Sequence, residues 1–258
     1  MRKKTGTGQL FICGLGVNRV KDMTLQTLKA LRSCDAVYYM HGDWRAVREL
    51  LRPLALKLKC FEDEKFYALP NSERVETAGR EICGELEKGK TIGYVTYGNP
   101  MLLSDGSSIL GYCREKGHRG LVITAPSSID SILGLMTDQY EIFSRGFHVY
   151  HAEMIIGRPE SLTTAATVIA LCVDDCIARK TFAGFCAQVE AAYPANHRIY
   201  AVRCEDGASG NAVLTTTAGG LRKMESRISY MMSLVLPCIE PAARGLTPKR
   251  RRQLFKGR

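Results

Sequence analysis

The sequence predicts two α/β domains, with a mostly parallel sheet in the first and a mixed sheet in the second. Through about residue 120, short apolar segments alternate with segments of helical spacing, which is the pattern of a parallel sheet covered by helices. The second half has more widely spaced elements and a turn-rich segment at 205–211, which favours antiparallel pairing. The 258 residues suffice for two hydrophobic cores. We therefore predict domains at residues 1–120 and 121–246, followed by a disordered basic tail at 247–258.

The individual elements follow from local patterns. Apolar runs predict strands at residues 9–17, 36–40, 56–60, 91–97 and 121–124. Helical spacing predicts helices at residues 24–33, 44–52, 73–88, 108–116 and 128–136. Pro53 and Gly89 mark the ends of two of these helices. In the second half we predict strands at 147–150, 167–172, 199–202 and 233–236, and helices at 182–192 and 221–230.

The net charge of +10 is concentrated at the two ends of the chain. Arg2, Lys3 and Lys4 contribute +3, and the last ten residues contribute +6. A solvated tail explains this charge more simply than a nucleic-acid contact does. No apolar run approaches the roughly 20 residues that a membrane helix needs. We therefore expect neither nucleic acid nor a membrane as a partner.

The ten cysteines lie scattered in apolar contexts and form no Cys-x-x-Cys pair. This usage predicts reduced thiols and a cytoplasmic location. Cys172 and Cys176 share one face of a predicted helix, but no histidine stands at ligand spacing, so packed thiols are favoured over a metal site. His148 and His151 are three residues apart and also have no third ligand nearby in the sequence. We therefore predict no metal ion.

Three turns marked by glycine or proline each follow a predicted strand. They are Gly14-Leu15-Gly16, Gly98-Asn99-Pro100 and the turn at residues 125–128. Ligands in open α/β sheets sit at the carboxyl ends of strands, so these turns are expected to surround one cofactor. The dinucleotide pattern Gly-x-Gly-x-x-Gly is broken by Arg19, which disfavours a nicotinamide dehydrogenase. The candidate cofactor-binding residues are Gly14, Leu15, Gly16, Tyr97, Gly98, Asn99, Pro100 and Ser128, although Ser128 has the alternative role of capping the following helix.

The three turns, with a Thr-Leu-x-Thr-Leu-x-Ala-Leu helix after the first, resemble the tetrapyrrole methylase superfamily of S-adenosylmethionine-dependent methyltransferases. Within it, the chain most resembles the borosin peptide-backbone α-N-methyltransferases. The segments that carry this resemblance are Phe66-Tyr67 with Arg74 and Thr77, Tyr150-His151-Ala152, Tyr193-Pro194 with His197, and residues 234–237. Ala78 stands where the family has a tyrosine.

The resemblance implies S-adenosylmethionine bound in a cleft between the two domains, a homodimer, and catalysis by Tyr67 and Arg74. Arg74 would stabilise negative charge on the acceptor carbonyl, and Tyr67 would orient or deprotonate the acceptor amide. The simpler alternatives are a helix charge at Arg74 that pairs with Glu73 or Glu81, and a packed aromatic side chain at Tyr67.

The acceptor is predicted to be a separate precursor peptide. Self-methylating members of the family carry their substrate as an extension rich in small apolar residues, whereas residues 247–258 are short and strongly basic. Two alternatives stay open. One is a methylase of a tetrapyrrole or another small acceptor, and the other is a degenerate protein that binds cofactor or peptide without turnover, which the loss of the tyrosine at Ala78 suggests.

Overall fold

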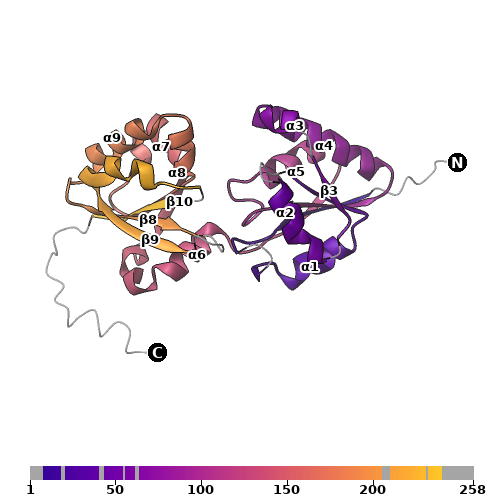
Figure 1. Cartoon of the computed structure of the whole chain (residues 1–258), viewed down its shortest axis with the longest axis horizontal. Coiled ribbons are helices and arrows are strands. Elements are labelled where there is room, and N and C mark those ends of the chain that lie inside the picture. Colours follow the sequence, from indigo (N-terminus) through magenta and orange to yellow (C-terminus); the bar gives the residue numbers. More distant parts are fainter. Residues whose placement is uncertain are drawn as a thin grey trace. The chain divides into compact units, whose positions relative to one another are not determined.

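The computed structural model describes residues 8–18, 21–40, 44–54, 56–61, 64–204, 210–230 and 232–239 (Figure 1). The described part of the chain divides into two compact units, the first within Met1–Leu135 and Cys204–Gly210, the second within Met136–Arg203 and Asn211–Arg258. Each unit holds one five-stranded sheet. No helix in the described ranges has the length and apolar character to cross a membrane. The tail at 247–258 lies outside the described residues.

The first unit is a parallel sheet with the strand order β3-β2-β4-β1-β5. Every strand pairing in it is parallel, which confirms the predicted sheet. The strands are β1 (Gln9–Gly14), β2 (Ala36–Tyr39), β3 (Leu58–Cys60), β4 (Thr91–Thr96) and β5 (Gly120–Ile123). The helices are α1 (Leu25–Arg32), α2 (Trp44–Leu51), α3 (Glu64–Ala68), α4 (Asn71–Glu87), α5 (Asp105–Glu115) and α6 (Ser128–Leu135), with a 3-10 turn η2 at Arg52–Leu54.

The boundary between the units differs from the predicted one at residue 120. Strand β5 pairs with β1 along its length and therefore belongs to the first sheet, although the sequence analysis assigned it to the second domain. Helix α6 also falls in the first unit, whose first segment ends at Leu135. The alternation of apolar and helical segments continues through α6 without a break, so the sequence offered no local mark for this boundary.

The central strands of the first sheet, β1, β2 and β4, are buried on both faces. Leu10 and Ile12 of β1 join one hydrophobic cluster, and Phe11 and Cys13 join another. Successive strand side chains point to opposite faces, so a strand covered on both sides is apolar throughout. This explains why the first-half strands were recognisable as continuous apolar runs.

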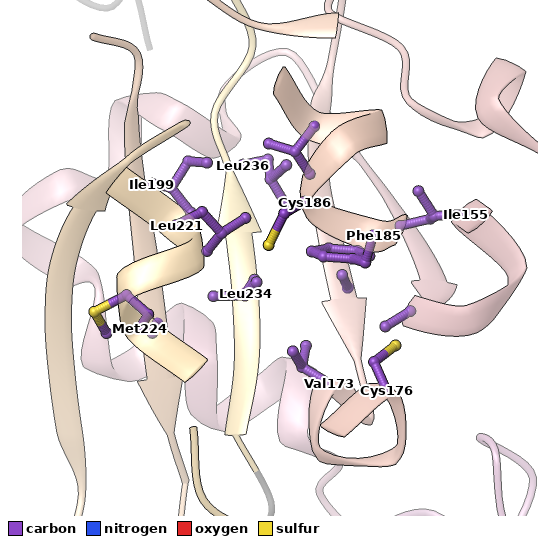
Figure 2. Close-up of a cluster of buried hydrophobic side chains, with 14 of the residues drawn as sticks. Ile155, Val173, Cys176, Phe185, Cys186, Ile199, Leu221, Met224, Leu234 and Leu236 are labelled. Carbon is purple, nitrogen blue, oxygen red and sulfur yellow. The ribbon is translucent and has the colours of Figure 1, made fainter. Parts of the chain in front are cut away.

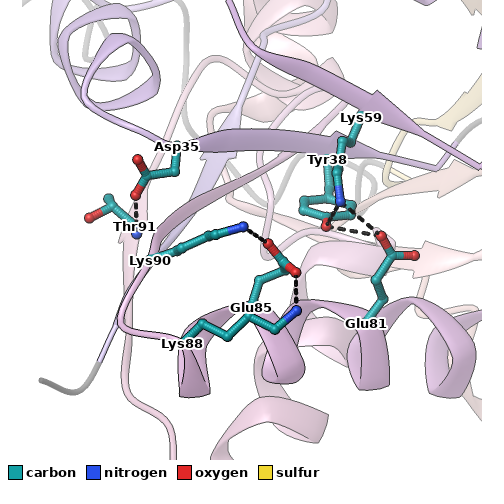
Figure 3. Close-up of polar contacts among 8 residues, drawn as sticks. All are labelled: Asp35, Tyr38, Lys59, Glu81, Glu85, Lys88, Lys90 and Thr91. Carbon is teal, nitrogen blue, oxygen red and sulfur yellow. Dashed lines mark hydrogen bonds and ion pairs between the residues drawn. The ribbon is translucent and has the colours of Figure 1, made fainter. Parts of the chain in front are cut away.

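Ion pairs join the end of α4 to the beginning of β4 (Figure 3). The Glu85 carboxylate accepts hydrogen bonds from Lys88 Nζ at 2.8 Å and from Lys90 Nζ. These two ammonium groups lower the pKa of Glu85 to about 2. The backbone N–H of Thr91 donates to the carboxylate of Asp35 at 2.9 Å. The start of β4 is therefore held by side chains as well as by the sheet.

A second polar cluster lies on the same helix, where Tyr38 Oη donates to Glu81 Oε1 at 3.0 Å (Figure 3). Lys59 Nζ donates to Tyr38 Oη at 3.1 Å and lies 3.4 Å from the Glu81 carboxylate. Burial and the neighbouring Glu81 raise the pKa of Tyr38, so this phenol stays neutral. The Glu81 carboxylate thus contacts side chains of both β2 and β3.

The second unit is a mixed sheet with the strand order β6-β7-β10-β8-β9, which confirms the prediction of more antiparallel pairing. Only β6 and β7 pair in parallel among its described strands. The strands are β6 (Phe147–His151), β7 (Thr167–Leu171), β8 (Arg198–Arg203), β9 (Ala212–Thr217) and β10 (Met232–Leu236). The helices are α7 (Ala152–Gly157), α8 (Val173–Ala178) and α9 (Phe182–Ala192), with 3-10 segments η3 (Thr137–Phe143), η4 (Pro159–Ser161) and η5 (Ala218–Arg227).

The core of the second unit joins α7, α8, α9 and η5 to the sheet (Figure 2). Phe185 and Cys186 of α9 are fully buried, as are Leu234 and Leu236 of β10. One expectation was wrong here, and one strand was missed. The helix predicted at 221–230 is the 3-10 segment η5, and strand β9 was not predicted because this Thr-rich strand pairs along one edge only and alternates between half-buried and exposed residues.

Candidate functional site

The three predicted turns meet at one edge of the first sheet. Strands β4, β1 and β5 are neighbours and run in parallel, so their carboxyl ends lie side by side. The backbone N–H of Leu15 donates to the carbonyl of Thr96 at 2.9 Å, which joins the first turn to the end of β4. This edge is where open α/β sheets bind their ligands.

Gly14 is the point where the three turns pack together. A Cβ atom at this position would lie 2.4 Å from the Gly98 carbonyl oxygen and 2.9 Å from both Pro100 Cδ and Ala125 Cβ. A glycine at the end of a strand can leave room for a ligand because it has no Cβ. At Gly14, however, atoms of the other two turns already occupy the Cβ direction. Gly14 is required for the turns to approach one another.

Gly16 and Gly98 connect the first two turns through a short antiparallel bridge. The Gly98 N–H donates to the Gly16 carbonyl at 3.0 Å, and both residues have positive φ, 81° at Gly16 and 62° at Gly98. A Cβ on Gly16 would collide with Asp22 Cβ at 2.1 Å. A Cβ on Gly98 would meet Ser127 Cα at 4.0 Å and nothing nearer. Among Gly14, Gly16 and Gly98, only Gly98 therefore has unoccupied space in the direction of its missing Cβ.

Asn99, Pro100 and Leu15 serve mainly to shape the turns. The Asn99 side-chain oxygen accepts a hydrogen bond from the Met101 N–H at 3.0 Å, which closes a local turn. Pro100 is buried, and its carbonyl accepts a hydrogen bond from Ser104 Oγ at 2.6 Å, the residue that caps α5. The Leu15 side chain lies in the core at 6% exposure. Leu15 can therefore contact a ligand only through its backbone.

Tyr97 and Ser128 both contact Cys204, which lies far away in the sequence. Tyr97 Oη donates to the Cys204 carbonyl at 3.1 Å, and Cys204 Sγ lies 3.9 Å from the Ser128 carbonyl oxygen. Burial raises the pKa of the Cys204 thiol to about 12, so it stays neutral. Cys204 was not predicted from the sequence, because nothing in its local pattern indicates which turn it joins.

The residue that caps α6 is Ser127 rather than Ser128. Both the N–H and the hydroxyl of Ser127 donate to Asp130 Oδ2 at 2.6 Å. The bond from the N–H to a side chain three residues later is one of the two bonds of a capping box, and the hydroxyl adds a further bond to the same oxygen. The bond from Ser127 lowers the pKa of the Asp130 carboxyl. Ser128 occupies the first helical position and is half-buried.

Thr96, at the carboxyl end of β4, was also missed by the sequence analysis. Its hydroxyl oxygen is buried and has no hydrogen-bond partner among the described residues. Leaving a buried hydroxyl without a partner costs about 1–3 kcal/mol, so the group calls for an explanation, and a bound ligand at this edge is one. Thr96 directly precedes the Tyr97–Gly98 turn.

Arg74 lies at the same edge of the sheet. Helix α4 ends at Glu87, and β4 begins only a few residues later, so the first turns of α4 lie near the carboxyl end of β4. Arg74 Nη2 donates to Asn71 Oδ1 at 3.3 Å and not to the carboxylate of Glu73 or Glu81. Arg74 Nε is buried and has no hydrogen-bond partner in the described part of the chain. Tyr67 lies in α3, but its side chain is outside the described residues.

Ala78 is fully buried on α4, in the cluster that includes Ile82 and Tyr94. One turn before it, Arg74 is only half-buried. The position at which the family tyrosine is replaced therefore faces the hydrophobic core in this chain.

A parallel sheet with glycine turns crowded at its carboxyl edge defines an α/β protein of the cofactor-binding class. A comparison with protein families matches residues 9–219 to the Tetrapyrrole (Corrin/Porphyrin) Methylases, and the chain belongs to this family. Members of the family are methyltransferases whose methyl donor is S-adenosylmethionine. The family predicted from the sequence is confirmed.

Two curated relatives match parts of the chain. The chain is 25% identical over 169 residues to a "methyltransferase/ribosomally synthesized type II borosin cyclic peptide precursor" of Phlebiopsis gigantea, covering 64% of this chain and 30% of that protein. It is 29% identical over 123 residues to diphthine synthase of Methanocaldococcus jannaschii, covering 48% of this chain and 46% of that protein. The matches thus span less than half the length of these relatives.

Solved structures share the fold. The chain matches uroporphyrin-III-C-methyltransferase of Thermus thermophilus with a TM-score of 0.65 at 15% identity, covering 89% of this chain and 94% of that chain. It matches the methyltransferase CobJ with a TM-score of 0.67 at 13% identity, covering 93% and 98%. Both matches extend over the two α/β units, which confirms the predicted fold class.

Proposed function

We propose that this protein transfers a methyl group from S-adenosylmethionine to backbone amide nitrogens of a separate precursor peptide. The observation that carries the proposal is the state of Arg74, a half-buried guanidinium at the carboxyl edge of the sheet whose Nε has no hydrogen-bond partner among the described residues. A guanidinium with a free donor is suited to bind a carbonyl oxygen that gains negative charge. The borosin-type relative supports a peptide as the acceptor.

The cofactor loops suit S-adenosylmethionine. Gly98 leaves one side of its backbone open, and the buried hydroxyl of Thr96 offers a polar group that the described residues do not satisfy. Together with the backbone of Gly16, they would hold the cofactor. When bound, it supplies an electrophilic methyl group on a sulfonium, which needs no metal for its transfer.

The residues of the chain have to activate the acceptor. An amide N–H is a poor nucleophile because its lone pair is delocalised into the carbonyl. Arg74 binds the carbonyl oxygen and stabilises the charge that develops when the N–H proton leaves. Tyr67 keeps the role predicted from the sequence, which is to orient the amide or accept that proton. The homodimer implied by the resemblance also belongs to this proposal, and light scattering of the purified chain would test it.

The experiment offers the full chain two acceptors in the presence of S-adenosylmethionine with a deuterated methyl group. One is a synthetic peptide with the core sequence of a type II borosin precursor, and the other is uroporphyrinogen III. Fragment-ion mass spectrometry is expected to place labelled methyl groups on backbone nitrogens of the peptide, with the mass of the enzyme chain unchanged.

Each other outcome contradicts the proposal in a different way. Methylation of the tetrapyrrole without the peptide would support a small-molecule methylase. Cofactor binding without transfer to either acceptor would support a binding protein without turnover. Label on the enzyme chain itself would refute the separate acceptor.

A further inference from the structure

Three potential metal ligands from separate positions in the chain meet in the second unit. They are His151 at the end of β6, Cys172 directly after β7, and Asp175 in α8. One ligand atom of each residue lies within 4.8 Å of the ligand atoms of the other two. His151 Nε2 is 3.0 Å from Asp175 Oδ2. The parallel pairing of β6 and β7 creates this cluster, since it places His151 opposite Leu171, the residue before Cys172.

The ligand set has the chemistry of a zinc site. An imidazole nitrogen, a thiolate sulfur and a carboxylate oxygen are the three ligand types that Zn²⁺ combines. Zinc lies about 2.3 Å from sulfur and about 2.0–2.2 Å from nitrogen and oxygen, which separates tetrahedral ligand atoms by roughly 3.5 Å. The observed spacing needs only small side-chain movements to reach this geometry. Three protein ligands leave the fourth position for water.

The surroundings favour a cation and allow it to enter. The side chains of His151 and Asp175 are 21% and 44% exposed, so the cluster is open to solvent on one side. Arg179, one turn after Asp175, is paired with Glu153 at 2.9 Å. The positive charge of Arg179 is therefore largely neutralised by Glu153. Asp174 and Asp175 add two negative carboxylates near Cys172. Burial and these carboxylates raise the pKa of the Cys172 thiol to about 12, so a metal ion would have to displace its proton.

The His151 ring has one adjustment to make. Its Nδ1 accepts a hydrogen bond from the Glu153 N–H at 3.3 Å, which places the ring proton on Nε2, toward Asp175. A metal at Nε2 requires the proton to move to Nδ1, and the long bond from Glu153 is then lost. The carboxylate of Asp175 exchanges its contact with the ring for a bond to the same ion.

We infer that His151, Cys172 and Asp175 form a zinc site that ties the ends of β6 and β7 to α8. The inference does not depend on the proposed methyl transfer, because the site is built entirely from residues of the second unit and its test measures the metal. It is an alternative to the expectation of no metal ion, and the zinc titration decides between the two. The third ligand that His151 and Cys172 lacked in the sequence is supplied by the fold.

The test uses the full chain, treated with EDTA and desalted. Titration with Zn²⁺ against a chromophoric chelator is expected to show one bound ion per chain. Titration with Co²⁺ is expected to show a thiolate-to-metal charge-transfer band, which reports Cys172 directly. His151→Gln, Cys172→Ser and Asp175→Asn are each expected to weaken zinc binding by at least about tenfold, since even partners of metal ligands contribute this much.

Two variants on the same helix serve as controls. Asp174→Asn removes a neighbouring carboxylate that is not a ligand, and it is expected to weaken zinc binding less than any of the three ligand variants. Cys176→Ser removes a buried thiol outside the cluster and is expected to bind zinc as the unmodified chain does. Circular dichroism confirms that each variant is folded. The inference is overturned if the unmodified chain binds no zinc, if the three ligand variants bind it as well as the controls do, or if the cobalt form lacks the charge-transfer band.

Discussion

Replacement of Gly98 by alanine tests where the cofactor binds. Gly98 has a φ of 62°, a region that costs an L-residue about 1–2 kcal/mol. The new methyl group would meet Ser127 Cα at 4.0 Å and no protein atom closer, so steric overlap adds nothing to this cost. The expected loss of folding stability is therefore about 1–2 kcal/mol. If the open side of Gly98 faces S-adenosylmethionine, the methyl group fills space that the cofactor needs.

Gly117→Ala is the matched control. Gly117 has a φ of 87°, and a Cβ there would have no neighbour within 4 Å, so the cost is again that of a positive φ and is of similar size. Gly117 follows α5 and precedes β5, so it lies at the opposite edge of the sheet from the three turns. Both variants are expected to lower the thermal midpoint by a few degrees, in keeping with about 2–4 °C per kcal/mol for a chain of this size.

Isothermal titration with S-adenosylmethionine and S-adenosylhomocysteine separates the two variants. Gly98→Ala is expected to weaken binding by at least about tenfold, or ~1.4 kcal/mol, while Gly117→Ala leaves the affinity unchanged. Equal affinities in the two variants, at equal loss of stability, would refute the placement of the cofactor against Gly98. Gly14→Ala is unsuitable for this purpose, because its Cβ would collide with protein atoms of the other turns.

Three further predictions concern α4. Arg74→Ala is expected to lower the rate of methyl transfer by about a hundredfold, which is the scale of a lost oxyanion donor. Its cofactor affinity in the same titration is expected to be unchanged. Arg80→Ala is the control, because it removes an exposed arginine paired with Glu76 and should leave turnover intact; a loss of turnover in this variant would show that the effect of Arg74→Ala is non-specific. Glu85 has a folded-state pKa of about 2 against an ordinary value of 4.5, so its stabilisation is present above about pH 4.5 and is lost as the pH falls toward 2. Glu85→Gln should flatten the decline of the thermal midpoint across this window, and a decline as steep as in the unmodified chain would count against the two lysine contacts. Ala78→Tyr, which restores the family residue, is expected to destabilise the fold by at least about 1–3 kcal/mol because the position is fully buried, and a gain in turnover at unchanged stability would contradict its placement in the core.

Local patterns were sufficient to predict most of the first unit. Its central strands are buried on both faces, so they stand out as continuous apolar runs, and the glycine and proline turns mark where β1 and β4 end. Those turns also indicated the carboxyl edge as the candidate cofactor site. Helix α5 begins earlier than predicted, at Asp105, because Ser104 caps it. The short helix α3 was not predicted.

The sequence by itself thus determined the family, the class of fold and the edge of the sheet at which the turns gather. The tertiary structure decided which atoms meet there. It places Cys204 against Tyr97, packs the other turns against Gly14, and joins His151 to Cys172. The physical reason is that periodicity reports only which side of an element is buried. Contacts between distant segments depend on strand register and on the packing of side chains, which appear only when the whole chain has folded.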